Sequence, residues 1–306
     1  MTEKSFESQL GVSQPFLLYE GAVRGRLVRL NGVASKVLGG HHTYPDIVTK
    51  ILGEAMAAAA ALADGLKFDG SFTLQIQGNG PLHTLVADIT SDREMRGCAK
   101  FHEEYLPSHN EPDKPDPSLL DLLGTGHIAF TVDQGADMER YQGIIEIAGT
   151  SIGDCVHQYF HQSEQLETAI KIVAGRTIPD DSQSPWQAAA LMVQRMPAEG
   201  GQSQSDEDED AWRTAVILMS SVSDEELLRP RLTEEDVLNR LYGTVGGRML
   251  DPRGLSVGCR CSRDRSAKIL ASFPMDEIRS MADDGKVSMM CEYCEVNFEF
   301  TEDELS

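Results

Sequence analysis

Four of the six cysteines of this chain lie close to its C-terminal end, in two pairs. Cys259 and Cys261 are separated by one residue, and Cys291 and Cys294 by two. Two close pairs joined by a loop or a helical hairpin can place four sulfurs at the corners of a tetrahedron, the arrangement that Zn²⁺ adopts with thiolates. The last of the eight histidines is His161, so the C-terminal region offers no imidazole ligand. The sequence therefore predicts one Zn²⁺ per reduced chain, bound by these four cysteines.

The spacing of the cysteines leaves two functions open for such a site. A closed four-thiolate site has no coordination position for water, so it suits structure or switching better than hydrolysis. Most sites of this kind are structural. However, Arg263, Arg265 and Lys268 follow the first pair, and positive charges favour the thiolate over the thiol and thus reaction with oxidants. A static zinc knot and a redox switch both remain compatible with the residues.

Length and composition predict a soluble protein of more than one domain. The chain has 306 residues, of which 41% are hydrophobic, which is ample for a core. Its start has no basic segment followed by an apolar run, and its longest apolar stretch, 55–63, is far shorter than the ~20 residues of a membrane span. We therefore expect a cytoplasmic protein without membrane contact, where clustered cysteines serve as metal ligands or redox sensors.

The charge argues against a nucleic-acid partner. The formal net charge is −22, and the acidic excess lies after residue 100. Nucleic-acid binding depends on neutralising phosphates with Lys and Arg, so a field of this sign would repel the ligand. This weakens the commonest interpretation of a small zinc module.

Residues 1–198 are predicted to form an α+β core domain. The first patterns along the chain predict a strand over 23–30 and then a helix over 47–66 that is capped by Asp46. A hairpin follows, with strands over 72–77 and 82–89 and a glycine-permitted turn at 78–81. Two further strands are predicted over 128–132 and 143–148, and a helix over 151–166 has Val156, Tyr159 and Phe160 on one face.

Residues 199–254 are predicted to form a metastable helical linker, followed by a zinc domain over 255–306. The polar stretch 200–205 and the acidic run 206–210 have nothing to bury and mark the boundary. Capping patterns begin at Ser223 and Thr233, so two or three short helices follow, and short helices need a partner surface. The apolar residues that we expect to be covered by the first domain are Trp212, Val216, Ile217, Met219, Val237, Leu238 and Leu241.

No catalytic residue is predicted, and the chain is not expected to be an enzyme. Cys155 with His157 or His161 could be a nucleophile and a base, but convergence cannot be shown for residues on one helix, and Cys is often a small buried side chain. The two histidines lack the glutamate of a metalloprotease helix motif, so a second metal is not expected.

Several strings together resemble the redox-regulated holdase chaperone family known as heat-shock protein 33. They run across nearly the whole chain and are Gly25–Leu30, His42–Pro45, Gln75–Leu82, Tyr141–Gly143, Tyr159–Gln165, Val193–Pro197, Cys259–Arg263 and Cys291–Cys294. The paired cysteines and the string at 159–165 are the specific parts.

The resemblance implies a redox-controlled, ATP-independent function. In this family the reduced, zinc-bound C-terminal domain keeps the protein inactive. Oxidation would join Cys259 with Cys261 and Cys291 with Cys294, the metal would leave, and the zinc domain and linker would unfold. The exposed apolar residues of the linker, the seven named above, would then bind unfolding client proteins and prevent their aggregation, often in a homodimer. Cys98 and Cys155 take no part in this switch.

The alternative is a zinc-ribbon adaptor that binds a protein or nucleic acid through a purely structural metal. Zinc content before and after oxidation distinguishes the two, because a structural site keeps its metal under mild oxidation.

Overall fold

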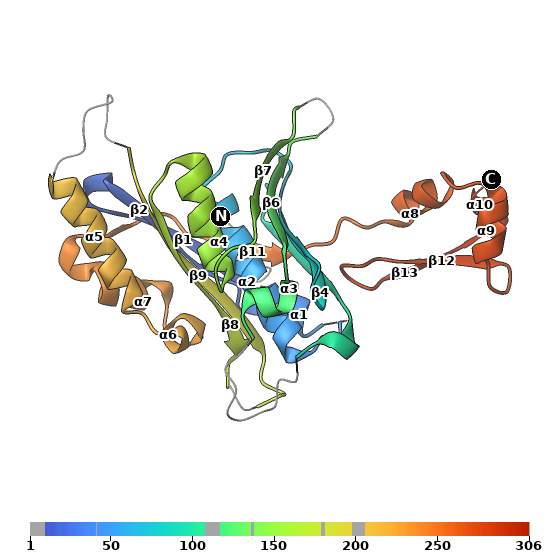
Figure 1. Cartoon of the computed structure of the whole chain (residues 1–306), viewed down its shortest axis with the longest axis horizontal. Helices are drawn as coiled ribbons and strands as arrows, with labels where there is room; N and C mark the ends of the chain where they lie inside the picture. The colour runs from blue at the N-terminus through green and yellow to red at the C-terminus, as the bar shows by residue number, and fades with distance from the viewer. Residues whose placement is uncertain are drawn as a thin grey trace, which may run out of the picture. The chain divides into compact units, whose positions relative to one another are not determined.

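The computed structural model describes residues 10–40, 42–107, 117–135, 138–178, 181–197 and 206–305. These residues form two compact units, which divide between Val257 and Gly258 (Figure 1). The first unit contains both the predicted α+β core and the predicted linker helices. The predicted boundary at residue 199 and the polar stretch 200–205 lie outside the described residues.

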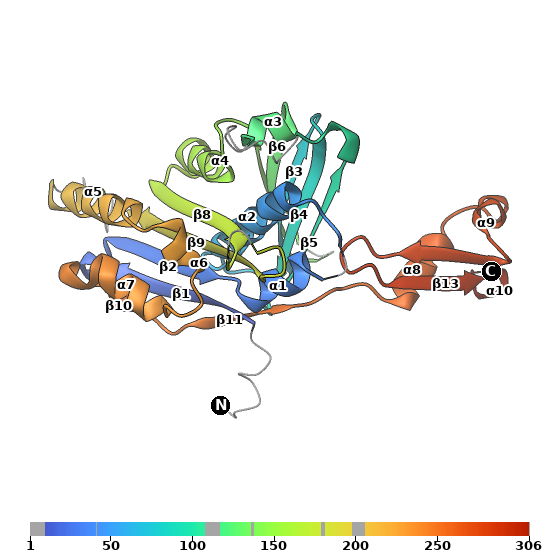
Figure 2. The same ribbon diagram turned by 90° about the horizontal axis from the view of Figure 1, so that it is seen from below.

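An eleven-stranded sheet organises the described part of the first unit (Figure 2). Its strands are β1 (Gly11–Leu18), β2 (Val23–Arg29), β3 (Ser71–Gly78), β4 (Leu82–Thr90), β5 (Glu94–Phe101), β6 (Gly126–Asp133), β7 (Tyr141–Glu146), β8 (Thr168–Arg176), β9 (Trp186–Arg195), β10 (Arg248–Met249) and β11 (Arg253–Val257). The order is β7-β6-β3-β4-β5-β11-β1-β2-β9-β8, and β10 pairs with β1. All pairs are antiparallel except β11 with β5, so β11 joins two antiparallel halves.

The predicted strands are confirmed, and the α+β class with them. The strand predicted over 23–30 is β2, the hairpin is β3 and β4, and the two later strands are β6 and β7. The pattern at 78–81 forms the predicted turn, where the Asn79 side chain accepts a hydrogen bond from the Thr125 backbone N–H at 2.9 Å. Of the strands in this sheet, the sequence did not identify β1, β5, β8, β9, β10 or β11.

The missed strand β9 is buried on both faces. Ala188, Ala190 and Met192 contribute to one hydrophobic core, while Leu191 and Val193 contribute to another. A strand covered on both sides is apolar without alternation, so its sequence lacks the period of two that reveals a half-exposed strand.

Helix α2 (Asp46–Ala63) fills the first core, and α1 (Gly32–Leu38) packs beside it. The alanines of α2 are small enough to let the strands of the sheet approach this helix closely. The prediction that Asp46 caps this helix is wrong. Pro45 occupies the cap position, and Asp46 is the first helical residue, with its carboxylate 2.8 Å from Nη2 of Arg176.

The helix predicted over 151–166 changes its winding partway. It begins at Ser151, whose side chain accepts a hydrogen bond from the Asp154 N–H, and α4 proper covers Ile152–Tyr159. A π-helical turn follows over Phe160–Glu164 and ends at the left-handed Gln165. Val156 and Tyr159 are buried as predicted, and Phe160 is partly buried. The short α3 (Leu119–Leu123) packs against β4.

Helices α5 (Asp206–Ser220), α6 (Asp224–Leu228) and α7 (Glu234–Tyr242) pack on the sheet face opposite α2 (Figure 1). The predicted capping boxes at Ser223 and Thr233 are both present. The acidic run 206–210, however, is not an unstructured spacer. It forms the first turns of α5, where carboxylates favour the positive end of the helix dipole, and Glu209 lies 2.7 Å from Nη1 of Arg195.

The coverage predicted for the linker side chains holds for six of seven. Met219, Val237, Leu238 and Leu241 are buried, and Trp212 and Val216 are half-buried against the same core. Ile217 is the exception, with 60% of its surface exposed. It follows Val216 directly, and successive helical residues point in directions about 100° apart, so both cannot face the sheet.

The second unit is small. It consists of α8 (Arg263–Leu270), α9 (Met275–Met281), the antiparallel pair β12 (Lys286–Met290) and β13 (Asn297–Thr301), and α10 (Glu302–Leu305). Its described core contains five buried side chains, namely Leu270, Ile278, Val287, Phe300 and Leu305. Short 3₁₀ turns in the first unit cover Tyr19–Gly21, Glu103–Tyr105 and Gly243–Val245.

Candidate metal centre

Local structure brings the two cysteine pairs of the second unit to one point. Cys259 and Cys261 precede α8, which begins after Ser262, whose side chain accepts a hydrogen bond from the Arg265 N–H. Cys291 and Cys294 lie in the turn between β12 and β13, closed by hydrogen bonds from Cys291 N–H to Val296 and from Glu295 N–H to Cys291. The helix start and the hairpin turn thus each present one pair.

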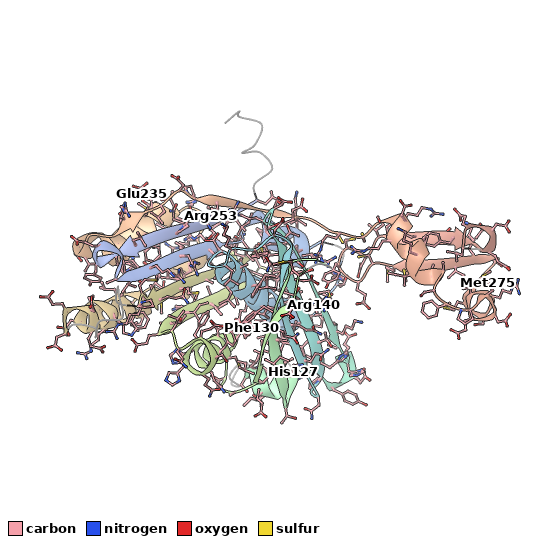
Figure 3. The ribbon with its side chains drawn as sticks, turned by 90° about the horizontal axis from the view of Figure 1, so that it is seen from above. His127, Phe130, Arg140, Glu235, Arg253 and Met275 are labelled. Atoms are coloured by element: carbon pink, nitrogen blue, oxygen red, sulfur yellow. The ribbon has the colours of Figure 1, made fainter. Side chains whose placement is uncertain are left out.

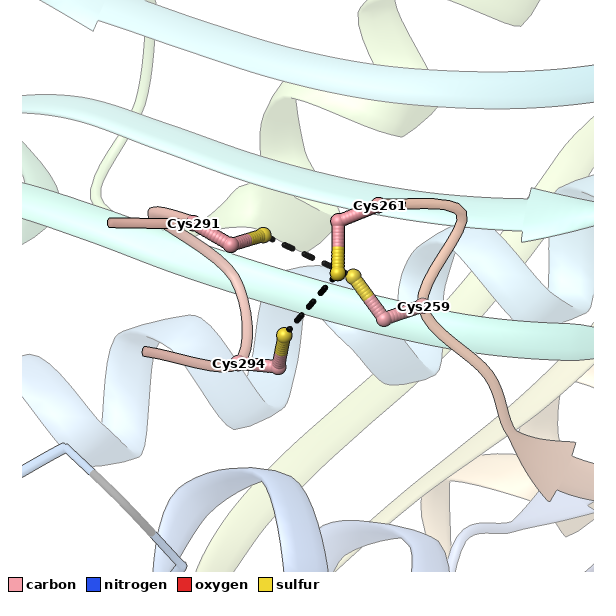
Figure 4. A group of neighbouring side chains, drawn as sticks. All are labelled: Cys259, Cys261, Cys291 and Cys294. Atoms are coloured by element: carbon pink, nitrogen blue, oxygen red, sulfur yellow. Dashed lines mark hydrogen bonds between the residues drawn. The ribbon is translucent and has the colours of Figure 1, made fainter. Parts of the chain in front are cut away.

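The four sulfurs form a compact cluster (Figure 4). Sγ of Cys259 is 3.6 Å from Sγ of Cys291, and Sγ of Cys261 is 3.4 Å from Sγ of Cys294. All four atoms lie within 4.8 Å of one another. Tetrahedral coordination at about 2.3 Å would place neighbouring sulfurs about 3.8 Å apart. The cluster therefore fits a metal ion that prefers four thiolates.

The thiols of the cluster differ in acidity. Burial of Cys259 opposes ionisation, but hydrogen bonds from the Cys261 backbone N–H and from the neighbouring thiols outweigh it and lower its pKa to about 7. Burial raises the pKa of Cys261, and it also raises that of Cys294.

Two of the three cations predicted to activate the cysteines, Arg263 and Arg265, have other partners. The Arg263 guanidinium lies 4.4 Å from the centre of the Phe300 ring and 2.6 Å from a carboxylate oxygen of Glu304. Arg265 donates to the backbone oxygen of Arg260. Hydrogen bonds within the cluster, rather than these cations, account for the lowered pKa of Cys259.

The alternative site around Cys155 is not assembled. Cys155 is fully buried, its thiol donates to the backbone oxygen of Ala148 at 3.0 Å, and burial raises its pKa. Nδ1 of His157 interacts with the backbone oxygen of Thr168 at 2.8 Å, and the rings of His157 and His161 are 6.5 Å apart. Cys155 is therefore a buried structural side chain, and Cys98 is buried as well.

Sequence reasoning missed the polar residues that fix the linker helices to the sheet. Arg29 donates to backbone oxygens of Glu226 and Leu232, and Lys171 donates to the backbone oxygen of Val222. The sequence did contain a sign of these contacts, because Arg29 and Lys171 are cations in strands that are otherwise mostly apolar. A buried charge needs a hydrogen-bonding partner, so such a cation indicates a polar contact to another segment.

Two further findings concern the molecule as a whole. Among the described residues, the four-cysteine cluster is the group of His, Cys, Asp or Glu side chains placed to hold a metal ion. No helix in the described ranges is both long and apolar enough to cross a bilayer.

Comparisons with known proteins agree along the whole length. Residues 12–301 match the profile of the family described as "Hsp33 protein". A "33 kDa chaperonin" of Caulobacter vibrioides is 37% identical over 274 residues, which cover 89% of this chain and 88% of that protein. One of Shewanella loihica is 35% identical over 286 residues, which cover 93% and 91%.

The fold is also shared with a solved structure. The crystal structure of the 33 kDa chaperonin (heat shock protein 33 homolog) of Thermotoga maritima superposes with a TM-score of 0.80, covering 97% of this chain and 96% of that one. The sequence identity is 22%, so this likeness bears on the fold.

Proposed function

Because the chain belongs to the Hsp33 protein family, whose relatives are named chaperonins, we propose that it is a redox-regulated, ATP-independent holdase chaperone. The reduced protein holds one Zn²⁺ through Cys259, Cys261, Cys291 and Cys294 and is inactive. Oxidation forms the disulfides Cys259–Cys261 and Cys291–Cys294, releases zinc, and activates the protein. The oxidant takes two electrons for each disulfide, and zinc leaves because disulfide sulfur is a poor ligand.

The observation that carries this proposal is the geometry of the sulfur cluster. Two sulfur–sulfur contacts, of 3.4 and 3.6 Å, join the segment before α8 to the β12–β13 turn. Disulfides within each pair would withdraw the sulfurs from both contacts. Oxidation would thus remove the metal and the connection between the two segments in one event.

The small core of the second unit supports the coupling of metal loss to unfolding. Each of its five buried side chains contributes about 1.5–3 kcal/mol. A core of this size is small for an independent unit, and metal binding supplies folding free energy to domains of this kind. We therefore infer that loss of the metal would destabilise this unit.

We further propose three functional regions: a core domain for client binding and dimerisation over 1–198, a metastable helical linker over 199–254, and a zinc-binding redox-switch domain over 255–306. Once the linker unfolds, its apolar residues bind unfolding client proteins in the cytoplasm, in a homodimer, without nucleic acid. Trp212, Val216, Met219, Val237, Leu238 and Leu241, which lie against the sheet, become accessible on unfolding, whereas the exposed Ile217 is accessible throughout.

The test compares the reduced full-length chain with the same chain after hypochlorite or peroxide treatment. We expect one zinc per reduced chain, its release on oxidation, and suppression of client aggregation without nucleotide by the oxidised form alone. Retention of zinc after oxidation would favour the structural adaptor. Equal suppression by both forms would refute the switch.

Replacement of Cys291 by Ser should abolish tight zinc binding, because three thiolates and a hydroxyl hold zinc poorly. Cys155→Ser is the matched control, since Cys155 belongs to the first unit and its hydroxyl can keep the hydrogen bond to Ala148. Unchanged zinc affinity in Cys291→Ser would disprove the ligand assignment.

A further inference from the structure

A pocket of about 360 Å³ opens in the first unit, where the two halves of the sheet diverge. Strands β2 and β9 contribute to one wall, and β3, β6 and β7 contribute to the other. The chain after α2 and the π-helical turn that follows α4 complete the lining. Figure 3 labels Phe130 on β6, within this wall. The pocket involves neither the cysteine cluster nor the apolar residues of the linker.

The interior of the pocket is aromatic. The rings of Phe130 and Tyr159 have centroids 4.5 Å apart, and those of Tyr159 and Phe160 lie 5.4 Å apart, nearly edge to face. Phe68 and Phe72 also contribute. Ring faces and edges at these angles pack well against another flat ring. The volume lies near the lower end of the ~300–1,000 Å³ typical of small-molecule sites, so it suits a compact ligand.

The polar groups of the pocket are mainly cationic. Arg24, Arg26 and Lys67 line it, and Glu164 is the one carboxylate among the described lining residues. That carboxylate already accepts hydrogen bonds from the hydroxyls of Tyr159 at 2.5 Å and Tyr141 at 2.7 Å. In a chain with a net charge of −22, this is a local site of positive charge.

The cations retain capacity to bind an anion. Arg24 donates through Nε to Gln194 at 3.3 Å, and within the described residues its two Nη atoms donate to no other group. Arg26 is 6% exposed. Within the described residues its Nε has no hydrogen-bond partner, and the nearest carboxylate oxygen, of Asp64, lies 3.9 Å from it. Burial lowers the pKa of Arg24 and lowers that of Arg26 to about 10. Arg26 is already paired with Asp64 and donates through Nη1 to the backbone oxygen of Ala61, so the Nη atoms of Arg24 provide the main capacity for an incoming anion.

We propose that this pocket binds a small aromatic carboxylate, with its ring among Phe130, Tyr159 and Phe160 and its carboxylate against Arg24 and Lys67. The aromatic lining selects the ring, and the cations select the charge. Bound ligand joins β2 and β9 to β6 and β7, so it stabilises the first unit. This site is independent of the redox function proposed above.

In the first experiment, the full-length chain is titrated with 2-naphthoate under reducing conditions, and the heat of binding is measured by isothermal titration calorimetry. The melting temperature is measured with and without the ligand. We expect saturable binding of one molecule per chain and a rise in the melting temperature. Neutral 2-naphthamide keeps the ring, and octanoate keeps the charge. Each should bind on the order of tenfold more weakly or worse, because each loses one of the two contacts.

Two variants locate the site, and one serves as control. Arg24→Gln should weaken 2-naphthoate binding on the order of tenfold, and Lys67→Gln by a smaller factor, because each removes one charged contact. Lys67 is exposed, so its replacement leaves the fold intact and decides the question if Arg24→Gln fails to fold. Arg213→Gln replaces an exposed arginine on α5, outside the pocket, and should leave binding unchanged.

Four outcomes would overturn the proposal. They are the absence of saturable binding at millimolar 2-naphthoate, equal binding of the amide, equal binding of octanoate, and affinity that is unaffected by both pocket substitutions.

Discussion

Arg29, at the end of β2, connects the sheet to the linker helices through the interior of the protein. Its side chain is 3% exposed and lies 3.7 Å from the Glu234 carboxylate. Nη2 donates to the backbone oxygen of Glu226 at 2.6 Å, and Nη1 donates to that of Leu232. Burial lowers the pKa of Arg29, and the charges of Glu234 and Asp236 oppose this effect. The residue therefore satisfies carbonyls that would otherwise be buried without a donor.

Replacement of Arg29 by Met should lower the free energy of unfolding by roughly 2–4 kcal/mol, because it leaves two backbone carbonyls without a donor. Urea unfolding followed by the fluorescence of Trp212, on the adjoining α5, measures this. Arg229→Gln is the matched control: Arg229 is exposed and pairs with Glu225 one turn away, so its loss should cost less than about 1 kcal/mol. Similar costs for the two variants would show that Arg29 does not fix the linker.

The linker helices α6 and α7 depend on their capping boxes, because neither is long enough to be stable alone. Ser223 and Thr233 each accept a hydrogen bond from the backbone N–H three residues later, and Glu226 and Asp236 accept in return. The backbone N–H of Ser223 is the main cause that lowers the pKa of Glu226, and the Thr233 hydroxyl is the main cause for Asp236. Both carboxylates stabilise their helix only when they are ionised.

The stability of the linker should therefore fall at acidic pH. A carboxylate whose pKa is lowered by folding stabilises the folded state fully at pH values above its usual pKa, which is 4.5 for Glu226 and 3.8 for Asp236. The contribution is lost as the pH falls through the lower, folded-state pKa. We expect the urea midpoint, followed by Trp212 fluorescence, to decline below about pH 4.5.

The double variant Ser223→Ala/Thr233→Val isolates the two caps from the other carboxylates. At pH 7 it should lose about 1 kcal/mol per cap. The difference from the parent chain should shrink, though not to zero, as the pH falls. Protonation weakens the hydroxyl-to-carboxylate hydrogen bonds in the parent, whereas the bonds from the backbone N–H groups to the two hydroxyls remain. A difference that stays constant from pH 7 to pH 3.5 would argue against the capping boxes as its source.

At the scale of the whole molecule, β11 connects the four-cysteine cluster to the sheet along the chain. Its last residue, Val257, pairs with Met95 on β5, and Cys259 follows two residues later. If the cluster binds a metal, its loss would release the segment that directly follows β11, the strand that pairs with both β1 and β5.

Hydrogen exchange should show residues 206–254 and 255–305 losing protection together on oxidation, while 72–78 and 82–90 in β3 and β4 stay protected. The reason is that β3 and β4 pair with strands of the core, whereas the linker elements depend on packing against it. The zinc-loaded reduced chain is the control. If the linker kept its protection after zinc release, the client site would have to lie on the core domain.

The sequence predicted the elements whose patterns are local. The hairpin of β3 and β4 alternates and has a glycine turn, and the cysteine pairs carry their ligand spacing within a few residues. Other features depend on partners far along the chain. Strand β9 lacks alternation because helices cover both of its faces, and the role of Arg29 depends on carbonyls about 200 residues away. The fold class, the clustering of the four cysteines and the apolar coverage of the linker could thus be predicted, and the pocket and the polar contacts of the linker could not.

The position of β11 also determines when this fold can be completed during synthesis. Gly11 pairs with Leu255, so one edge of β1 and the neighbouring edge of β5 lack their partner until the ribosome has passed that residue. At roughly 5–20 residues per second, the edge of β1 waits on the order of 12–50 s. An unpaired strand edge is a template for wrong pairing with other chains. The nascent protein is thus itself most prone to misassociation until the strand directly before the first cysteine pair has been made.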